Sequence, residues 1–506
     1  MFAGRVTVTV DQRKLHSVSE DFVGKLLSRI AERADRETVS SAGLRLSGYE
    51  FLGLVEYAAE AMSGDLGISA GDVVAIRAFQ GPIGLVIRYA AFSLGAIVFH
   101  IPDVGPSRQQ AVIDAAAPTV IVTDGTAVPG ASGSANSVPI QTLPALHVAG
   151  SRDKGIAARD TFRPRYGPED VALLMPSGGT TSVPKITYRT AQTLLSAVPG
   201  HDPDMRRLVT THLAYFAGAG CDSALGAGGS VFFAAGKPAA TELVKLIASE
   251  QITHMFMVEP ALGKFVAEAH HDRPGDLNQA TTTLRELWHM GSSAPAHLRT
   301  RAHELLGDKV IHSYGASEVG AVTSTAGEPF DPHSTGRALP GAEYRIIAAD
   351  GREAPAGAVG TIEAKTPFMG AGYWKNGTTQ PFTEWFRSND QGYIDPNGRL
   401  VVTGRNSDLI GGIVMPAAIE DVVYRLSETI EYVAVIPYVA PVSATPVDAT
   451  VFIQSAEFHR HQLTQDTLAQ DFPTLRLAVV VLPAIPLTEQ GKPDRLALVE
   501  SHTSTS

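Results

Sequence analysis

The chain has 506 residues, of which 44% are hydrophobic and 18% charged, with 48 glycines and 32 prolines. This length and composition exclude a single small core, a fibrous protein and a disordered one, and they predict several packed globular units. The net charge of −11 offers no basic surface to a polyanion, so we expect no nucleic-acid partner.

The cysteine content and the apolar stretches bear on where the protein works. Cys221 is the single cysteine, which excludes an internal disulfide and fits a reducing compartment; we expect it to be a small buried hydrophobe. The start, MFAGRVTVTVDQRK, lacks a basic region followed by an apolar run and a cleavage site. Residues 89–102 form the most apolar stretch, which is too short for a membrane span. We therefore expect a cytoplasmic protein without a membrane segment.

The first part of the chain alternates helix-like and strand-like patterns. A helix is predicted over residues 49–62, and strands are predicted over residues 73–79, 96–101 and 119–124. The apolar stretch 89–102 predicts a core helix that runs into a buried strand. Strands that alternate with helices predict a mostly parallel α/β sheet. Residues 126–154 are rich in Gly, Ser and Pro and are expected to form a surface excursion.

The rest of the chain falls into three regions. Strand-like and helical segments continue from residue 208 to 291 and predict a second α/β layer. After Gly336, short strands with Asp-Gly and Asn-Gly pairs predict β-hairpins. Beyond residue 404 a helix, two strands and a final strand before a polar tail suffice for a small domain. We expect an α/β protein with a large N-terminal domain, 1–404, made of two α/β layers and a β-rich subdomain, and a small mobile α+β domain, 405–506.

A glycine-rich segment, LLMPSGGTTSVPKI, occupies residues 173–186. Its small hydroxylated residues and glycines can expose backbone N–H groups, and Lys185 adds a cation, as binding of a triphosphate requires. It is not a Walker A loop, because no GxxxxGK[ST] pattern is present. An ordinary Gly-Ser-Thr loop is the alternative interpretation.

Three further segments carry residues suited to nucleotide chemistry. HSYGASEVG, residues 312–320, offers an aromatic ring that can stack on a base and Glu318, which can bind Mg²⁺ beside a phosphate. In residues 385–408, Asp390 can accept both ribose hydroxyls and Arg405 can reach the sugar or phosphate. In LTEQGKPDR, residues 487–495, a turn that we expect to be exposed presents Lys492. Each segment alone is also compatible with an ordinary turn or hairpin.

The order and spacing of the four segments resemble those of the superfamily of acyl-CoA synthetases, nonribosomal peptide adenylation domains and firefly-type luciferases. The signatures of that superfamily read roughly SGTTGxPK, YGxTE, TGDxGxxDxxGxLxxxGR and PxTxxGKxxR. The similarity covers nearly the whole chain. It implies an acid–AMP ligase that uses Mg·ATP to convert a carboxylic acid into an acyl-AMP.

The resemblance also implies roles for single residues. Tyr314 would stack on adenine, Ser317 would touch the α-phosphate and Glu318 would bind Mg²⁺. Asp390 would hold the ribose, with Arg405 as the arginine that follows it, and Lys492 would bridge the acid and the α-phosphate. The β- and γ-phosphates would meet a loop that includes Ser177, Gly178, Gly179, Thr180, Thr181 and Lys185, and the strip beside the adenine would contain Gly291, Ser292 and Ser293.

The segment SGGTTSVPKITYRT looks most similar to the aryl-acid AMP ligases of siderophore pathways. In those enzymes a His-Asn pair follows the next strand, and the asparagine contacts an ortho-hydroxyl of the benzoate; here His212 matches the histidine, a candidate catalytic residue, while Leu213 replaces the asparagine. A leucine cannot make that hydrogen bond, and no FDxS aspartate is present for an α-ammonium group. A flat or apolar acid is therefore favoured over an amino acid. The implied acid pocket comprises His212, Leu213, Tyr215, Gly218 and Gly315.

The region after Arg405 departs from the family pattern. GRNSDLIGGIVMPAAIE is about three residues shorter than the pattern GRxxDxIKxxGxxVxPxEIE, and it lacks the lysine after the isoleucine; Ser407 occupies the hinge position. That loop usually serves thioester formation, so the acceptor is open. We expect the acyl group to pass to the thiol of CoA or of a carrier-protein phosphopantetheine; capture by an amine or other nitrogen nucleophile is the alternative. A homologue that binds nucleotide without turnover is the alternative from another class.

Overall fold

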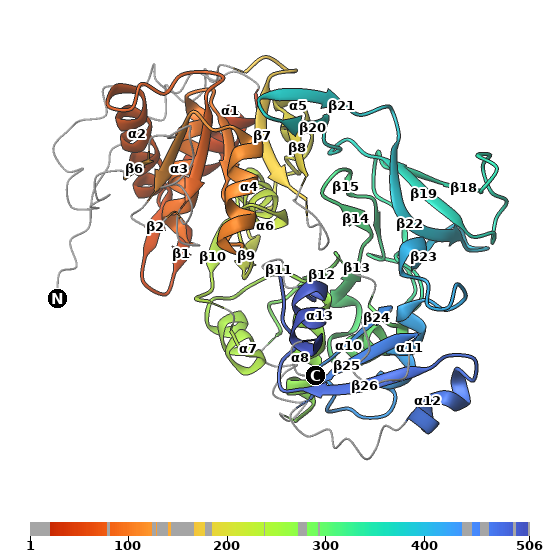
Figure 1. The fold of residues 1–506 in the computed structure, drawn as a ribbon. Helices are drawn as coiled ribbons and strands as arrows, with labels where there is room; N and C mark the ends of the chain where they lie inside the picture. The colour runs from red at the N-terminus through yellow and green to blue at the C-terminus, as the bar shows by residue number, and fades with distance from the viewer. Residues whose placement is uncertain are drawn as a thin grey trace.

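A computed structural model describes residues 21–77, 81–123, 128, 140–142, 166–177, 185–236, 238–271, 281–291, 294–437, 448–455, 465–488 and 492–503. Two large sheets carry most of the chain before residue 315, and smaller sheets follow them (Figure 1). The expected mixed α/β class is confirmed.

The first large sheet has eight strands in the order β21-β20-β8-β7-β4-β3-β5-β6. Its pairs from β7 to β6 are parallel, whereas β8, β20 and β21 add antiparallel strands at one edge. Strands β3, β4, β5 and β7 are almost continuously apolar and buried, as expected for a sheet covered on both faces. The strands are β3 Val73–Arg77, β4 Ile97–His100, β5 Val120–Thr123, β6 Ile140–Thr142, β7 Val171–Pro176, β8 Ile186–Thr190, β20 Gly372–Lys375 and β21 Thr378–Pro381.

The second large sheet has seven strands in the order β13-β12-β11-β9-β10-β1-β2, all parallel except for the pairing of β1 with β2. Parallel strands share one carboxyl edge, so the segments that follow β9, β11, β12 and β13 lie at the same edge of the sheet. The strands are β1 Glu37–Ser41, β2 Arg45–Ser47, β9 Arg206–Val209, β10 Ser230–Phe233, β11 His254–Met257, β12 Glu286–His289 and β13 Val310–His312.

Helices cover both sheets. Helix α3 contacts β1 of one sheet and β3 and β4 of the other, and it is buried along its length, which confirms the predicted core helix that runs into a strand. The predicted helix over 49–62 is α2, which begins with a capping box between Ser47 and Glu50. The helices of this part are α1 Phe22–Ala31, α2 Gly48–Gly64, α3 Pro82–Ser93, α4 Pro106–Ala116, α5 Ala191–Ser196, α6 Phe216–Gly226, α7 Ala240–Ser249, α8 Glu259–His271, α10 Ala296–Leu306 and the 3₁₀ turn η2 Gly307–Lys309.

The predicted β-hairpin region forms an antiparallel four-stranded sheet, β18-β19-β22-β23, with two short ladders beside it. In this sheet Asp390 on β22 lies directly opposite Arg405 on β23. The strands are β18 Glu343–Ile347, β19 Gly360–Lys365, β22 Phe386–Ile394 and β23 Leu400–Arg405, and the ladders are formed by β14 Gly315–Ala316, β15 Gly320–Ala321, β16 Thr323–Ser324 and β17 Arg337–Ala338.

The segment after Arg405 builds a three-stranded sheet with helices. Its elements are η3 Asn406–Asp408, α11 Pro416–Tyr424, β24 Tyr432–Pro437, β25 Ala449–Gln454, α12 Gln465–Asp471, β26 Leu477–Leu482 and α13 Arg495–Thr503. The expected polar tail is wrong, because α13 follows the last strand and buries Leu498. In Figure 1 this segment (blue) lies against α8 and α10, with which it shares one apolar cluster.

Two other expectations meet the structure. Most of residues 126–154 lie outside the described residues, but Ile140–Thr142 forms strand β6 at the edge of the first sheet. Cys221 is fully buried, as expected. Among the described residues, no helix combines the length and the apolarity that crossing a bilayer requires.

Candidate active site

Tyr314 of the second motif and Arg405 of the third motif both donate to the carboxylate of Asp390. The Tyr314 hydroxyl donates to Asp390 Oδ2 at 2.9 Å, and Arg405 Nε donates to Asp390 Oδ1 at 3.0 Å. Asp390 and Arg405 face each other across the β22–β23 hairpin, while Tyr314 follows β13. Burial, and then the charge of Asp390, raises the pKa of Tyr314 well above its usual value, so the phenol stays protonated.

Glu318 and Lys185 meet at an aromatic ring that the sequence analysis missed. The Tyr373 hydroxyl donates to Glu318 Oε1 at 3.4 Å, and Lys185 Nζ lies 5.0 Å from the centre of the Tyr373 ring. Burial and the nearby Glu318 raise the pKa of Tyr373 to about 12. Tyr373 lies on β20, which pairs with β8 directly after Lys185, so tertiary pairing places the ring there.

The ends of the glycine-rich segment are fixed by a pair of hydrogen bonds. Ser177 N donates to Lys185 O at 2.6 Å, and Lys185 N donates to Ser177 Oγ at 3.0 Å. These bonds continue the antiparallel β7–β8 pair and close the loop between its strands. Six residues with expected phosphate or adenine contacts lie outside the described residues, namely Gly178, Gly179, Thr180, Thr181, Ser292 and Ser293.

A second residue that sequence reasoning missed is Arg189, which lies on β8 near the end of the stretch SGGTTSVPKITYRT. Its Nη2 donates to the carbonyl of Ser317 at 2.8 Å, and its Nη1 lies 2.9 Å from Met175 Sδ. Burial lowers the pKa of Arg189 to about 10, against the opposing charge of Glu318. A buried cation on β8 thus holds the backbone between Ser317 and Glu318.

Lys492 comes from the far end of the chain into this cluster. It closes a turn with Thr488, where Lys492 N donates to Thr488 Oγ1 at 3.2 Å and Thr488 N donates to Lys492 O at 2.6 Å. Gly291, at a φ of +97°, lies beside it: a methyl group on Gly291 would be 3.5 Å from Lys492 Cε and 4.0 Å from Nζ. Gly291 and Lys492, which are 201 residues apart in the sequence, are therefore neighbours in the fold.

The expectation that Lys492 lies in an exposed turn is wrong, because the residue is partly buried. Burial, and then the positive charge of Arg405, lowers the pKa of Lys492 to about 8, while Asp390 and Glu318 oppose the shift. These three groups belong to the other motifs. Their charges act on Lys492 because the C-terminal segment packs on α8 and α10 and brings the lysine beside Gly291.

An ion pair links the lysine turn to the start of the C-terminal segment. Arg495 Nη1 lies 3.0 Å from Asp408 Oδ2, and Asp408 follows Arg405 by three residues. Asp494 caps α13 by accepting from Ala497 N at 3.1 Å, and its own N–H donates to Pro486 O at 2.8 Å. The turn around Lys492 is therefore held at both of its ends.

Four residues of the expected acid pocket, His212, Leu213, Tyr215 and Gly218, lie where β9 leads into α6, whereas Gly315 lies on β14. His212 Nδ1 accepts from Ala214 N at 3.1 Å, so a neutral His212 carries its proton on Nε2. Burial, and then the charge of Arg77, lowers the pKa of His212 to about 4. Leu213 is buried in the apolar cluster of the first sheet. Tyr215 immediately precedes α6.

Two glycines of the expected acid pocket allow close approach of backbone to backbone. A methyl group on Gly218 would lie 2.5 Å from Leu213 O and 3.7 Å from Arg88 Nη1. One on Gly315 would lie 2.4 Å from Gly320 O. Glycine is thus required by the local turn at both positions, independently of any ligand.

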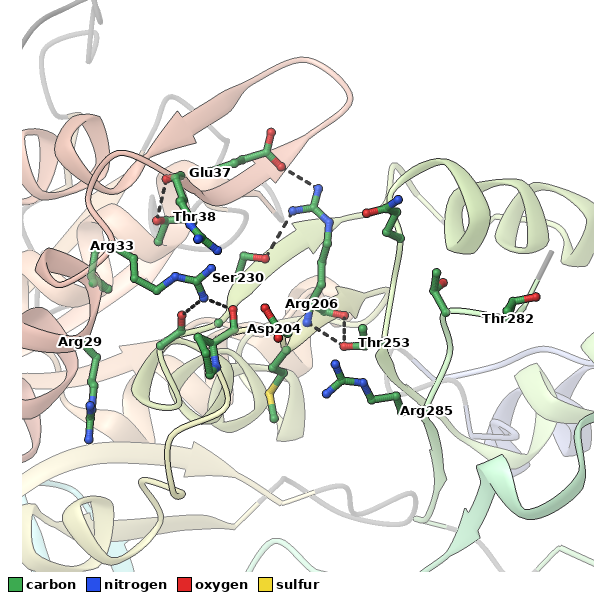
Figure 2. A pocket seen from close by; sticks show the side chains of 18 residues that line it. Arg29, Arg33, Glu37, Thr38, Asp204, Arg206, Ser230, Thr253, Thr282 and Arg285 are labelled. Carbon is green, nitrogen blue, oxygen red and sulfur yellow. Dashed lines mark hydrogen bonds and ion pairs between the residues drawn. The ribbon is translucent and has the colours of Figure 1, made fainter. Parts of the chain in front are cut away.

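A cavity of 670 Å³ lies at the opposite edge of the second sheet, where β9, β10 and β12 begin (Figure 2). Five arginines contribute to its lining, but carboxylates neutralise much of their charge: Arg206 pairs with Glu37 at 2.6 Å and with Glu250 at 2.9 Å. None of the four motifs contributes a residue to this cavity. We therefore place the candidate active site at the carboxyl edge, around Lys492.

Comparison with known proteins identifies the family of the chain. The family model described as AMP-binding enzyme matches residues 27–374. The chain belongs to the AMP-binding enzyme family. It is an adenylating enzyme similar to acyl- and aryl-CoA ligases, and MatB from Rhodopseudomonas palustris, solved with ATP bound, has a similar fold, with a TM-score of 0.76 at 21% identity and 96% of this chain and 99% of that one covered.

Individual relatives span most of the chain. The indoleacetate–CoA ligase of Aromatoleum aromaticum is 26% identical over 490 residues, which cover 88% of this chain and 91% of that protein. The anthranilate CoA ligase AuaEII, solved with anthranoyl-AMP, superposes with a TM-score of 0.78 at 19% identity and covers 98% of this chain and 100% of that one. The amide bond synthetase McbA from Marinactinospora thermotolerans gives 0.75 at 20% identity, with 95% and 99% covered. These two structures share the fold.

Proposed function

We propose that this AMP-binding ligase activates an aryl or other non-amino carboxylic acid with ATP, forming an acyl-AMP and releasing pyrophosphate. The position of Lys492 beside Gly291 carries the proposal. At this position the lysine is close enough to Arg405, Asp390 and Glu318 for their charges to shift its pKa. A cation that reaches the nucleotide-binding motifs from the C-terminal segment is what adenylation requires.

The chemistry explains why a cation is needed. A carboxylate oxygen attacks the α-phosphorus, the bond from that phosphorus to the oxygen bridging to the β-phosphorus breaks, and pyrophosphate leaves with the electron pair. Because two anions approach each other, the rate depends on positioning and on positive charge at the α-phosphate. Lys492 supplies that charge, and Ser317, whose carbonyl Arg189 holds, contacts the α-phosphate.

The nucleotide would be held by groups that already meet around Asp390. Tyr314 stacks on the adenine, Asp390 accepts from the ribose hydroxyls and Arg405 reaches the sugar or phosphate. The β- and γ-phosphates meet a loop that comprises Ser177, Gly178, Gly179, Thr180, Thr181 and Lys185, and the adenine lies beside Gly291, Ser292 and Ser293.

Magnesium fits the site as a partner of the phosphates. Among the described residues no three His, Cys, Asp or Glu side chains gather as a metal site. Mg²⁺ typically takes one or two carboxylates and completes its shell with phosphate oxygens and water. Glu318 is the carboxylate offered here, and the ion would neutralise phosphate charge. The residues present therefore fit Mg·ATP better than a metal held by protein alone.

The acid would lie near His212, Leu213, Tyr215, Gly218 and Gly315. Leu213 is apolar and buried, which supports an aryl or apolar acid over an α-amino acid. His212, neutral above pH 4, can donate from Nε2 to the acid and is the candidate catalytic residue on this side.

Two acceptors remain as proposals. The first is a thiol, of CoA or of a carrier-protein phosphopantetheine, which attacks the acyl carbon while AMP leaves. The second is an amine or other nitrogen nucleophile. A specific observation favours the second: the shortened loop after Asp408 closes in a tight turn, with a bridge between Ile410 and Val414. The amide bond synthetase McbA also shares the fold.

ATP–pyrophosphate exchange across a panel of aryl and aliphatic acids tests the first half-reaction, with Lys492→Ala as the inactive reference. Exchange in the unaltered enzyme with at least one acid, lost in that variant, is expected. Full exchange by Lys492→Ala would refute the role of the lysine, and silence across a broad panel would favour a nucleotide-binding homologue. Hydroxamate trapping with a measurement of CoA consumption then separates the acceptors, since adenylation without a thiol product indicates a nitrogen nucleophile.

A further inference from the structure

The C-terminal segment reaches the active site through a docking surface on helices α8 and α10. Helix α11 packs on α10, and β24 packs on α8. Apolar side chains from both sides join one cluster, which includes Leu262 of α8, Leu298 of α10, and Ile419, Val423 and Tyr424 of α11. Burial of such side chains stabilises the docked segment, but apolar contact alone does not fix an orientation.

One polar contact crosses this surface as a helix cap. Helix α10 begins after Pro295, which provides no side-chain cap. Asp421 of α11 replaces it, since its Oδ1 accepts from the backbone N–H of His297 at 2.6 Å. A carboxylate at a helix N-terminus satisfies an otherwise free donor and is favoured by the helix dipole. The cap of one helix therefore depends on a residue of the docked segment.

A second polar contact uses a buried arginine. Arg301 of α10 is 5% exposed; its Nε lies 2.6 Å from Glu428 Oε2, and its Nη2 donates to the Glu428 carbonyl at 2.6 Å. Burial lowers the pKa of Arg301, against the opposing charge of Glu428. Undocking would break both contacts of this guanidinium with Glu428, so the ion pair and the hydrogen bond form only when the segment is docked.

The third contact is a close approach of backbones at Gly263 in α8. A methyl group there would lie 2.2 Å from Glu431 O and 3.4 Å from Tyr424 Oη. No side chain fits into this space unless the segment moves away. Glycine at this position therefore lets the strand that begins after Glu431 lie directly on α8.

We propose that Gly263, Arg301 and Asp421 are positioning residues for adenylation: together they hold the C-terminal segment so that Lys492 lies beside Gly291. The inference rests on the proposed function, which makes Lys492 the residue at the α-phosphate. It adds that the placement of this lysine is set by three contacts away from the nucleotide. All three join α8 or α10 to the segment after Arg405, and none lies in the four motifs.

Chemical labelling tests the placement without any substrate. An amine-reactive ester is applied over a series of pH values, and modification of Lys492 is followed by mass spectrometry, with the exposed Lys375 as an internal reference. In Gly263→Ala, Arg301→Leu and Asp421→Ala, the pH at which labelling of Lys492 is half-maximal should move up from about 8 toward the ordinary lysine value of 10.5, because release of the turn removes the burial that lowers the pKa. Unchanged labelling of Lys492 in all three folded variants would overturn the proposal, whatever the enzyme's substrate.

Matched controls separate docking from general destabilisation. Gly64→Ala alters a helical glycine with nothing within 4 Å, and Arg345→Leu removes an arginine that pairs with Glu363 in the hairpin sheet. Neither control should change the labelling of Lys492. Thermal melting identifies any variant that fails to fold, and the remaining variants carry the test.

Once an acid substrate is known, kinetics give a second readout. The three variants should lower kcat of pyrophosphate exchange by up to ~100-fold, as a catalytic group misplaced by an ångström does, with little change in KM for ATP. In the Lys492→Ala background they should cost nothing further, because they act through the lysine. Equal losses in both backgrounds would show that they do not act through Lys492.

Discussion

Lys492 and Gly291 are in contact distance, with 3.5 Å between Lys492 Cε and the place where a methyl group on Gly291 would lie. The glycine also has a φ of +97°, which other residues adopt only with strain. An added methyl group would make only ordinary van der Waals contact with Lys492, so Gly291→Ala should lower stability through backbone strain, and a shift of the backbone that relieves this strain beside the lysine should lower adenylation. Thermal melting measures the first effect and pyrophosphate exchange the second.

The control for that substitution is Gly71→Ala. Gly71 has a φ of +86° and nothing within 4 Å of an added methyl group, so it shares the backbone strain without the lysine contact. We expect both variants to lose stability, by about 1–2 kcal/mol each, and only Gly291→Ala to lose exchange activity beyond the folded fraction. Equal exchange by the two folded variants would contradict the contact.

The pH dependence of adenylation should follow Lys492. Its pKa of about 8 results from burial and from Arg405, and only the protonated form supplies charge at the α-phosphate. The rate of adenylation should fall as the pH rises through 8. Because the unfolded chain retains a lysine pKa near 10.5, it binds more protons than the folded chain between these values, so the contribution of Lys492 to stability rises with pH there.

Arg405→Gln tests the origin of that pKa. Removal of the neighbouring positive charge should move the alkaline limb of the pH–rate profile upward, since Asp390 and Glu318 then act on Lys492 with less opposition. An alkaline limb that stays near 8 in this variant would assign the profile to another group. Arg345→Gln, in the same sheet but away from the lysine, should leave the limb unchanged.

The phenol of Tyr314 should matter through Asp390. Tyr314→Phe keeps the ring for stacking but removes the 2.9 Å hydrogen bond to the carboxylate. A hydrogen bond to a charged group contributes about 1.5–3 kcal/mol, so KM for ATP should rise by roughly tenfold or more if the bond orients Asp390 toward the ribose. Tyr344→Phe is the matched control, because its hydroxyl donates to Gly398 O on an outer turn. Identical KM values for the two variants would remove Tyr314 from ribose binding.

A buried ion pair between α3 and α6 should dominate local stability. Arg88 is 1% exposed and donates from Nε to Asp222 Oδ1 at 3.1 Å, and the Tyr89 hydroxyl donates to the same carboxylate at 2.7 Å. Asp222→Asn should lower the free energy of unfolding by about 3–5 kcal/mol, since it leaves a buried guanidinium unpaired. Glu32→Gln, which breaks the exposed Arg29–Glu32 pair, should cost about 0–1 kcal/mol. Urea unfolding distinguishes these outcomes.

The sequence predicts those contacts of the fold and the site that form between residues close to each other along the chain. The hairpin that pairs Asp390 with Arg405 follows from Asn-Gly and strand patterns, and the helix–strand run over 89–102 follows from apolar residues. Tyr373 could not be assigned in this way, because β20 reaches Lys185 only through pairing with β8. Arg189 lies inside the stretch SGGTTSVPKITYRT that carries the resemblance, so its position in the sequence pointed to it. Its contact with Ser317 joins two sheets and could not be predicted from the sequence.

The burial of Lys492 was missed for a related reason. A turn with Gly and Pro near the chain end is normally exposed, and only the docking of α11 and β24 on α10 and α8 brings it into the site. The helix after it, α13, was missed because a polar sequence with few apolar residues gives little helical periodicity, although Leu498 packs inward.

The cap that Asp421 provides for α10 limits which C-terminal segments of related enzymes can replace the segment of this protein. A C-terminal segment transplanted from a relative will not seat on this protein unless it brings an acceptor for the His297 N–H and a carboxylate for Arg301. It must also tolerate the tight spacing at Gly263. Chimaeras that respect these three positions should inherit the donor's lysine turn in register with the host's nucleotide residues, while those that break them should fold with the lysine out of register and lose pyrophosphate exchange.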